Sequence, residues 1–196
     1  HIVSGALREG MPARHRCREG HRGCRLAVHK VLDDRTIDLE LSAGRPEVVQ
    51  DGVCLGAQLM AAAMDAKVSR NPHKEIGWFP VNKEKDEHTA FTEEIPKTFD
   101  AFHWHGDTFE IPEEAEHLVS SAATSNQGFC IGGSALALQF HLELRAGDAN
   151  RIAEACHDDL TLGKYVQQPE EFTMKKDLFE DANKLMGRLL QTLEKV

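Results

Sequence analysis

A cysteine held between two glycines, in the stretch DGVCLGAQLM at residues 51–60, constrains this chain more than any other feature. A β-branched run, PEVVQ, precedes it, and the helix-forming stretch LGAQLMAAAMD follows it. Such a cysteine is either a small buried hydrophobe or the nucleophile of an elbow, in which a strand turns sharply into a helix and raises one side chain toward solvent. The glycines favour the elbow, although the charge of Asp51 would be costly if this strand end were buried.

The bulk composition predicts one globular domain. The chain has 196 residues, of which 41% are hydrophobic and 28% charged, enough for a core of its own. No apolar run reaches the ~18 residues of a membrane span, and no apolar signal segment opens the chain. The five cysteines are odd in number and irregularly spaced, so we expect reduced thiols and a cytoplasmic protein.

The N-terminal region differs from the rest in charge. Residues 1–31 hold seven Lys and Arg against two Glu, whereas the whole chain has a net charge of -9. This arm has no aromatic residue to stack on bases and no binding motif, so we do not expect it to bind nucleic acid. Cys17, His21, Cys24 and His29 match no common zinc-ligand spacing. We therefore expect an irregular basic segment over residues 1–45 and the main domain over 46–196.

Within the main domain, strand and helix patterns alternate. Short strands are predicted at residues 66–70 and 75–81, a strand followed by a loop at 97–109, and a buried strand at SALALQF, with a hairpin turn at CIGG before it. The chain ends on a helix whose apolar stripe comprises Leu178, Phe179, Ala182, Leu185, Met186, Leu189, Leu190 and Leu193. These patterns predict a three-layer α/β domain with a mostly parallel sheet.

Two further residues could complete a catalytic site with Cys54. A thiol attacks as a thiolate, which a helix N-terminus stabilises, and the N–H of Leu55 would be free to hold an oxyanion. In LQFHLE, His141 and Glu143 are two apart on a predicted strand, so both side chains leave on one face. Glu143 could hold one imidazole nitrogen and leave the other for the thiol, as a Cys-His-Glu triad requires.

Four segments together resemble the class I glutamine amidotransferases, in particular the stand-alone proteins related to the glutaminase domain of GMP synthase. They are GVCLGAQLMAAAMDAKV, EIGWFPV, FHWHGDTFEIP and LQFHLE, in the same order and spacing. The resemblance implies a flavodoxin-like sandwich with the site at the carboxyl edge of the sheet. It also implies that Cys54 attacks the glutamine amide, that His141 activates the thiol and protonates the leaving ammonia, and that Glu143 orients His141.

The same resemblance suggests which residues contact the substrate, and it shows where this sequence differs from the family pattern. It assigns Leu55, Gln58 and the loop His105-Gly106-Asp107 to glutamine binding, and it implies no cofactor. No ligand set completes a metal site at His103 and His105, so no metal is expected. The family's first βαβ unit is missing or degraded here, with Gly5 a weak candidate for its oxyanion donor, and Leu142 stands where many relatives have proline.

The resulting hypothesis is a glutaminase. The triad would hydrolyse the glutamine side-chain amide through a γ-glutamyl thioester and release glutamate and ammonia for transfer to an acceptor, which we expect on a separate synthetase chain. Two alternatives stay open at this point. The same residues could serve a γ-glutamyl peptidase or hydrolase, or the chain could be a non-catalytic remnant of the family.

Overall fold

The computed structural model describes residues 24–32, 35–43, 50–84 and 89–195, and the side chains from residue 51 onward within these ranges. Its main sheet has six strands in the order β3-β8-β7-β6-β4-β5. Their bounds are β3 (Gln50–Val53), β4 (Val68–Lys83), β5 (Thr98–Phe109), β6 (Glu116–Ser121), β7 (Gly128–Ile131) and β8 (Ala135–Leu138). The helices are α1 (Leu55–Ala63), α2 (Ala90–Glu94), α3 (Ala146–Ala155), α4 (Pro169–Phe172) and α5 (Lys176–Leu193), with a 3-10 turn at His157–Asp159.

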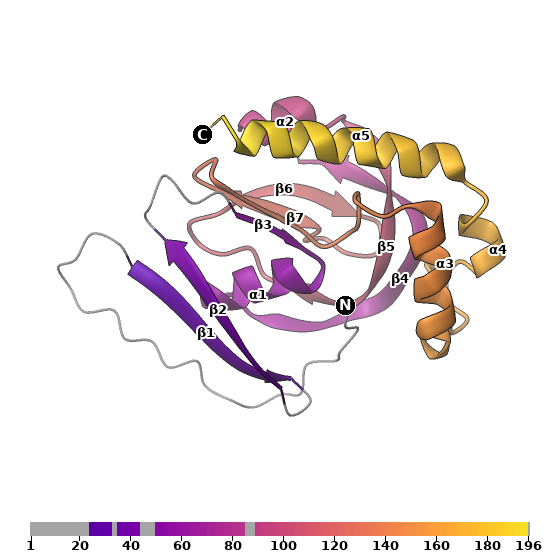
Figure 1. The fold of residues 1–196 in the computed structure, drawn as a ribbon, viewed down its shortest axis with the longest axis horizontal. Coiled ribbons are helices and arrows are strands. Elements are labelled where there is room, and N and C mark those ends of the chain that lie inside the picture. Colours follow the sequence, from indigo (N-terminus) through magenta and orange to yellow (C-terminus); the bar gives the residue numbers. More distant parts are fainter. Residues whose placement is uncertain (1–23, 33–34, 44–49, 85–88, 196) are drawn as a thin grey trace.

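The three-layer α/β arrangement expected from the sequence is confirmed. Helices α2 and α5 lie together over one face of the curled sheet, and α1 lies on its other side (Figure 1). Strand β8 shows why both faces are covered. Its Leu136 and Leu138 join the larger hydrophobic cluster on the α5 side, whereas Ala135 and Ala137 alternate with them and pack with α1 residues in a second cluster.

The expected direction of most strands is wrong. Of the strand pairs in the described main sheet, β3 and β8 run parallel, and every other neighbouring pair is antiparallel. The single parallel pair carries the elbow. Antiparallel strands can follow one another through short turns, as at the CIGG turn between β7 and β8, so this half of the sheet needs no helical crossovers.

Two strands also occupy part of the region expected to be irregular. β1 (Cys24–Leu32) and β2 (Arg35–Ala43) form an antiparallel two-stranded sheet of their own. The expectation is therefore wrong for these residues. Residues 1–23 and 44–49, which include Gly5, Cys17 and His21, lie outside the described residues, and the division of the chain at residue 46 stays a prediction.

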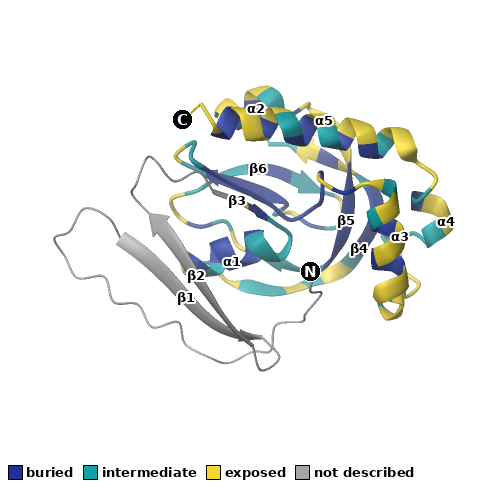
Figure 2. Ribbon diagram, viewed as in Figure 1, coloured by how far each residue is buried: buried dark blue, intermediate teal, exposed yellow. Residues whose placement is uncertain are grey.

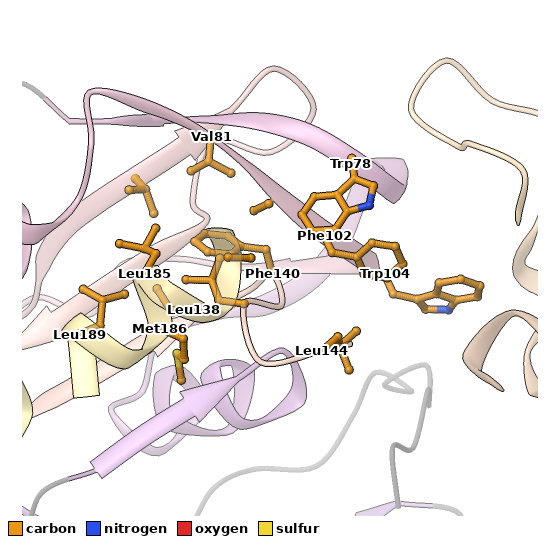
Figure 3. Packing of buried hydrophobic residues seen from close by; sticks show 14 of the residues in the cluster. Trp78, Val81, Phe102, Trp104, Leu138, Phe140, Leu144, Leu185, Met186 and Leu189 are labelled. Atoms are coloured by element: carbon orange, nitrogen blue, oxygen red, sulfur yellow. The ribbon is translucent and has the colours of Figure 1, made fainter. Parts of the chain in front are cut away.

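The C-terminal stripe is confirmed as core packing, except that Leu190 is exposed. Helix α5 turns Phe179, Leu185 and Leu189 inward and leaves its other side to solvent (Figure 2). The ring of Trp78 on β4 meets Phe179 edge-on, with centroids 4.7 Å apart. Figure 3 shows how α5 side chains such as Leu185 and Leu189 lie around Phe140 and Val81, so one helix closes the core from β4 to β8.

Strand β4 is one long strand where the sequence suggests two. Its register against β5 shifts between Arg70 and Glu75, which separates the two expected pieces without ending the strand. Gly77 has φ +108°, a conformation that favours glycine, and a Cβ there would lie 2.4 Å from Gln167 Oε1. Gln167 uses this space to bind the backbone of Trp78, accepting from its N–H at 2.9 Å and donating to its carbonyl at 3.0 Å.

The elbow is confirmed. Strand β3 ends at Val53, α1 begins at Leu55, and Cys54 between them has φ 52° and ψ -105°, a backbone conformation that L residues rarely adopt. Asp51 is exposed, so the cost of burying its charge does not arise. None of the helices in the described ranges has the length and apolar character needed to cross a bilayer; the cytoplasmic location stays a prediction.

We expect Gly52→Ala to destabilise the protein and Gly56→Ala to leave its stability nearly unchanged. A Cβ at Gly52 would lie 2.5 Å from Met60 Sδ and 2.8 Å from the backbone carbon of Gly56, whereas a Cβ at Gly56 meets nothing within 4 Å. Such overpacking costs about 1–3 kcal/mol. Denaturant unfolding of the two variants measures the difference, and equal midpoints would contradict this account of the elbow.

Candidate active site

The elbow presents Cys54 at the N-terminus of α1, half-buried and with a free thiol. Its backbone N–H donates to Leu138 O at the end of β8, at 2.8 Å, which ties the elbow to the neighbouring strand. Its Sγ lies 3.8 Å from Trp104 O on β5. The first N–H groups of a helix have no partner within the helix, and Leu55 supplies the first of them beside the thiol.

His141 and Glu143 lie together, although the strand that was expected to carry them ends earlier. β8 stops at Leu138, and His141 is held by a separate bridge in which its N–H donates to Phe102 O at 2.7 Å. The His141 Nδ1 and Glu143 Oε1 atoms are 2.7 Å apart. Glu143 therefore occupies Nδ1, which leaves Nε2 as the imidazole nitrogen available to a third group.

The electrostatics identify that group as the thiol. Burial by itself lowers the pKa of His141, but hydrogen bonding and charge from Cys54 and Glu143 outweigh it and raise the pKa to about 10. Burial likewise opposes ionisation of Glu143, and its hydrogen bond with His141 nevertheless lowers the pKa of this carboxyl. Cys54 and Glu143 thus both act on the imidazole of His141, and both favour its protonated form.

We expect the ring of His141 to stay protonated at neutral pH and to lose its proton only as the pH rises through about 10. NMR of ring-labelled histidine follows this titration directly. In Cys54→Ala the midpoint should fall, because one of the groups that stabilise the imidazolium is gone, and Glu143→Gln should lower it for the same reason. A wild-type midpoint near the ordinary histidine value of about 6.5 would contradict this arrangement.

Two hydrogen-bonded glutamine side chains also approach the thiol, and one of them, Gln139, was not predicted from the sequence. Gln139 Nε2 lies 3.7 Å from Cys54 Sγ, and Gln139 Oε1 accepts from Gln58 Nε2 at 3.1 Å. Because an amide oxygen can only accept, this contact turns the Gln139 amide so that its N–H faces the sulfur. Gln139, His141 and Glu143 are each two residues apart, so the spacing that paired the last two could also have pointed to Gln139.

The segment His105-Gly106-Asp107 is not a loop. It lies within β5, and the expectation of a loop there is wrong because β4 pairs with it on both sides of the register shift. The His105 side chain is buried, with Nδ1 3.1 Å from Asp107 O and Nε2 toward Glu75. Asp107 pairs with Arg70 at 3.5 Å. Side chains from this segment therefore contact β4, and their role in glutamine binding stays a prediction.

Glu75 is the other residue that sequence reasoning missed. It is a fully buried carboxylate on β4 that accepts from Ser121, Thr124 and Gln127, at 3.0, 3.1 and 2.7 Å. Burial opposes the charge of Glu75, but His103, His105 and the hydrogen bond from Ser121 lower its pKa. The signal was available in EIGWFPV, where one charged residue opens an otherwise apolar strand.

Comparison with known proteins bears directly on this site. The family model described as glutamine amidotransferase class-I matches residues 50–156, which is more than half of the chain and contains the elbow, His141 and Glu143. The chain belongs to the class I glutamine amidotransferases. Its recognition from four sequence segments is therefore confirmed.

Relatives of this amidotransferase share part of their length with it. It is 30% identical over 93 residues to the glutamine amidotransferase-like protein YfeJ of Salmonella typhimurium, covering 47% of this chain and 39% of that one. It is 35% identical over 99 residues to a GMP synthase [glutamine-hydrolyzing] of Campylobacter jejuni, covering 48% of this chain and 18% of the synthase. The chain thus spans less than half the length of these curated relatives.

Solved structures agree with the fold. A glutamine amidotransferase from Methylobacillus flagellatus superposes with a TM-score of 0.68 at 26% identity, covering 74% of this chain and 61% of that one. One from Thermotoga maritima gives 0.54 at 36% identity, covering 74% and 60%. The described α/β domain is thus similar to these enzymes over most of this chain and over about three fifths of theirs.

Proposed function

We propose that this chain hydrolyses the side-chain amide of L-glutamine through a thioester on Cys54. The observation that carries the proposal is the convergence on His141, whose Nδ1 is held by Glu143 at 2.7 Å and whose charge is stabilised by Cys54 at a strained helix N-terminus. Nucleophile, base and orienting carboxylate are the parts that an acyl transfer at a thiol requires. Membership of the amidotransferase family supports glutamine as the acyl donor.

The geometry divides the reaction into two steps. Cys54 attacks the amide carbon as a thiolate paired with the protonated ring of His141, while the N–H of Leu55 binds the oxygen that becomes negative. His141 then donates the proton to the leaving nitrogen, so the C–N bond breaks, ammonia leaves and a γ-glutamyl thioester forms. Water attacks the thioester with His141 taking its proton, the C–S bond breaks, glutamate leaves, and the sulfur returns to a thiolate beside the protonated ring of His141.

A substrate comparison tests this proposal. The folded protein is mixed with glutamine and, separately, with γ-glutamyl dipeptides, and ammonia and glutamate are measured in each. Equal amounts of both products from glutamine support the glutaminase. Glutamate from the dipeptides alone would instead establish a γ-glutamyl peptidase, and no product from either substrate would mean a non-catalytic member of the family.

The proposal includes a partner that uses the ammonia. The relatives named GMP synthase [glutamine-hydrolyzing] support a synthetase as the kind of partner. Without it, the ammonia should appear in bulk solution, where a coupled assay detects it.

A further inference from the structure

A cluster of two histidines and one glutamate lies apart from Cys54, His141 and Glu143. Glu75 lies directly opposite His105 in the β4–β5 register, and His103 follows two residues away on the same face of β5. One donor atom from each of the three lies within 4.8 Å of the others. All three side chains are essentially inaccessible to solvent, at 0–1% exposure.

The hydrogen bonds around the histidines decide where their protons lie. His105 Nδ1 is 3.1 Å from the carbonyl oxygen of Asp107, which can only accept, so Nδ1 carries a proton, and Nε2 has no hydrogen-bond partner among the described residues. His103 Nδ1 is 3.4 Å from Gln127 Nε2, which can only donate, so this nitrogen accepts with its lone pair. His103 Nδ1 and His105 Nε2 both lie within 3.7 Å of Glu75 Oε2.

Glu75 meets these nitrogens at distances that hydrogen bonds do not explain. His105 Nε2 and His103 Nδ1 lie 3.5 and 3.7 Å from Glu75 Oε2. Both gaps exceed the roughly 2.9 Å of a normal N–H···O bond. They are close to the roughly 3.3 Å that separates two ligands of a tetrahedral zinc ion bound at about 2.0 Å.

We propose that Glu75, His103 and His105 form a buried binding site for a divalent transition-metal ion, with Zn²⁺ as the intended ion. Two imidazole nitrogens and one carboxylate suit zinc, whereas calcium and magnesium prefer oxygen ligands alone. Glu75 Oε2, the oxygen from which these distances are measured, accepts from Ser121, Thr124 and Gln127, whereas Oε1 has no hydrogen-bond partner among the described residues and is the oxygen that would coordinate. Gln127 Oε1 is a further buried acceptor in the same cluster that has no partner there.

The surroundings match those of metal ligands in proteins. A ligating histidine commonly donates its second N–H to a backbone carbonyl, as His105 does, and a ligating carboxylate is itself hydrogen-bonded, as Glu75 is by Ser121 and Thr124. Because the site is closed to solvent, the ion would be structural. It would join β4 to β5 where their register shifts, next to Gly106 and Asp107.

Zinc binding to the whole chain tests the proposal. Cys54 is first blocked with iodoacetamide, so that the thiol and His141 cannot supply a competing site, and the protein is stripped with a chelator and titrated with Zn²⁺. We expect one tightly bound ion per chain by elemental analysis and a higher Tm with zinc. His103→Gln should weaken binding about 100-fold or more, whereas the control His157→Gln, at an exposed site, should not.

If His103→Gln fails to fold, the spectrum of Co²⁺ bound to the wild-type protein still tests the proposal. Wild-type protein loaded with Co²⁺ should show visible d–d bands without the near-ultraviolet charge-transfer band of a cobalt-bound thiolate, because this site has only nitrogen and oxygen ligands. No stoichiometric zinc in the wild type, a thiolate band on the bound cobalt, or unchanged affinity in a folded His103→Gln would each overturn the proposal. Since Cys54 is blocked throughout, none of these outcomes depends on the glutaminase.

Discussion

Replacing Cys54 by alanine should abolish glutamine hydrolysis outright while the protein remains folded. The thioester cannot form without the sulfur, and neither His141 nor Gln139 offers a substitute nucleophile at this position. Alanine is smaller than cysteine and retains the contact of the residue 54 N–H with Leu138 O, so the elbow has no reason to collapse. Ammonia release is measured together with circular dichroism on the same sample.

The matched control is Cys156→Ala, which removes a half-buried thiol at the end of α3 and should keep full activity. A glutamine-mimicking diazo-ketone provides a second measurement on the wild type. It should label Cys54 and none of the other four thiols, Cys17, Cys24, Cys130 and Cys156. Labelling spread over these cysteines in proportion to their exposure would contradict a unique nucleophile.

Glu143→Gln should reduce turnover by about 10²–10⁴-fold, in line with other orienting carboxylates of catalytic triads. The amide can still accept from His141 Nδ1, but it can also rotate to present its N–H, and it lacks the charge that stabilises the imidazolium. Because Cys54 stays in place, stoichiometric labelling of the thiol should persist, at a lower rate. Steady-state ammonia release gives kcat, and mass spectrometry gives the labelling.

Glu154→Gln is the control for this variant, since it removes an exposed carboxylate from α3 without touching the triad. Its kcat should equal that of the wild type. A loss of less than tenfold in Glu143→Gln would mean that the 2.7 Å contact with His141 holds the loop without serving catalysis.

Local patterns predicted the elements of this fold well. The elbow at Cys54 follows from glycines between a β-branched run and helix formers, and α5 follows from an apolar stripe at helical spacing. The hairpin turn at CIGG follows from its two glycines, which have φ 51° and 73°. In each case the information lies within a few neighbouring residues.

Local sequence patterns could not predict the relative direction of the strands or the length of β4. A strand reads the same whether its neighbour is parallel or antiparallel, so the mostly antiparallel sheet could not be read from β4 to β7. Residues 71–74 separate the two expected strands, yet β4 runs through them with a register shift against β5, and Gln167, far along the chain, binds the backbone of Trp78 on the same strand. Tertiary contacts of this kind override local signals.

In the candidate site too, residues close in sequence could be predicted to lie together, whereas contacts set by strand pairing could not. His141 and Glu143 could be paired from their spacing, and the structure does bring them together with Cys54. Glu75 could not be linked to His103 and His105, because its partners are set by the β4–β5 register and not by sequence distance. Gln139 lay within reach of the spacing rule but points at Cys54 only because β8 pairs with β3.

The parallel β3–β8 pair also sets the order in which this molecule assembles. Cys54 and Gln139 are 85 residues apart, whereas β7 meets β8 across a short turn. Closing a long loop costs entropy that grows with its length, by about 0.6 kcal/mol for each doubling. A refolding chain should therefore form its hairpins before it joins the elbow to β8, so that recovery of the reactive thiol lags behind recovery of hairpin structure.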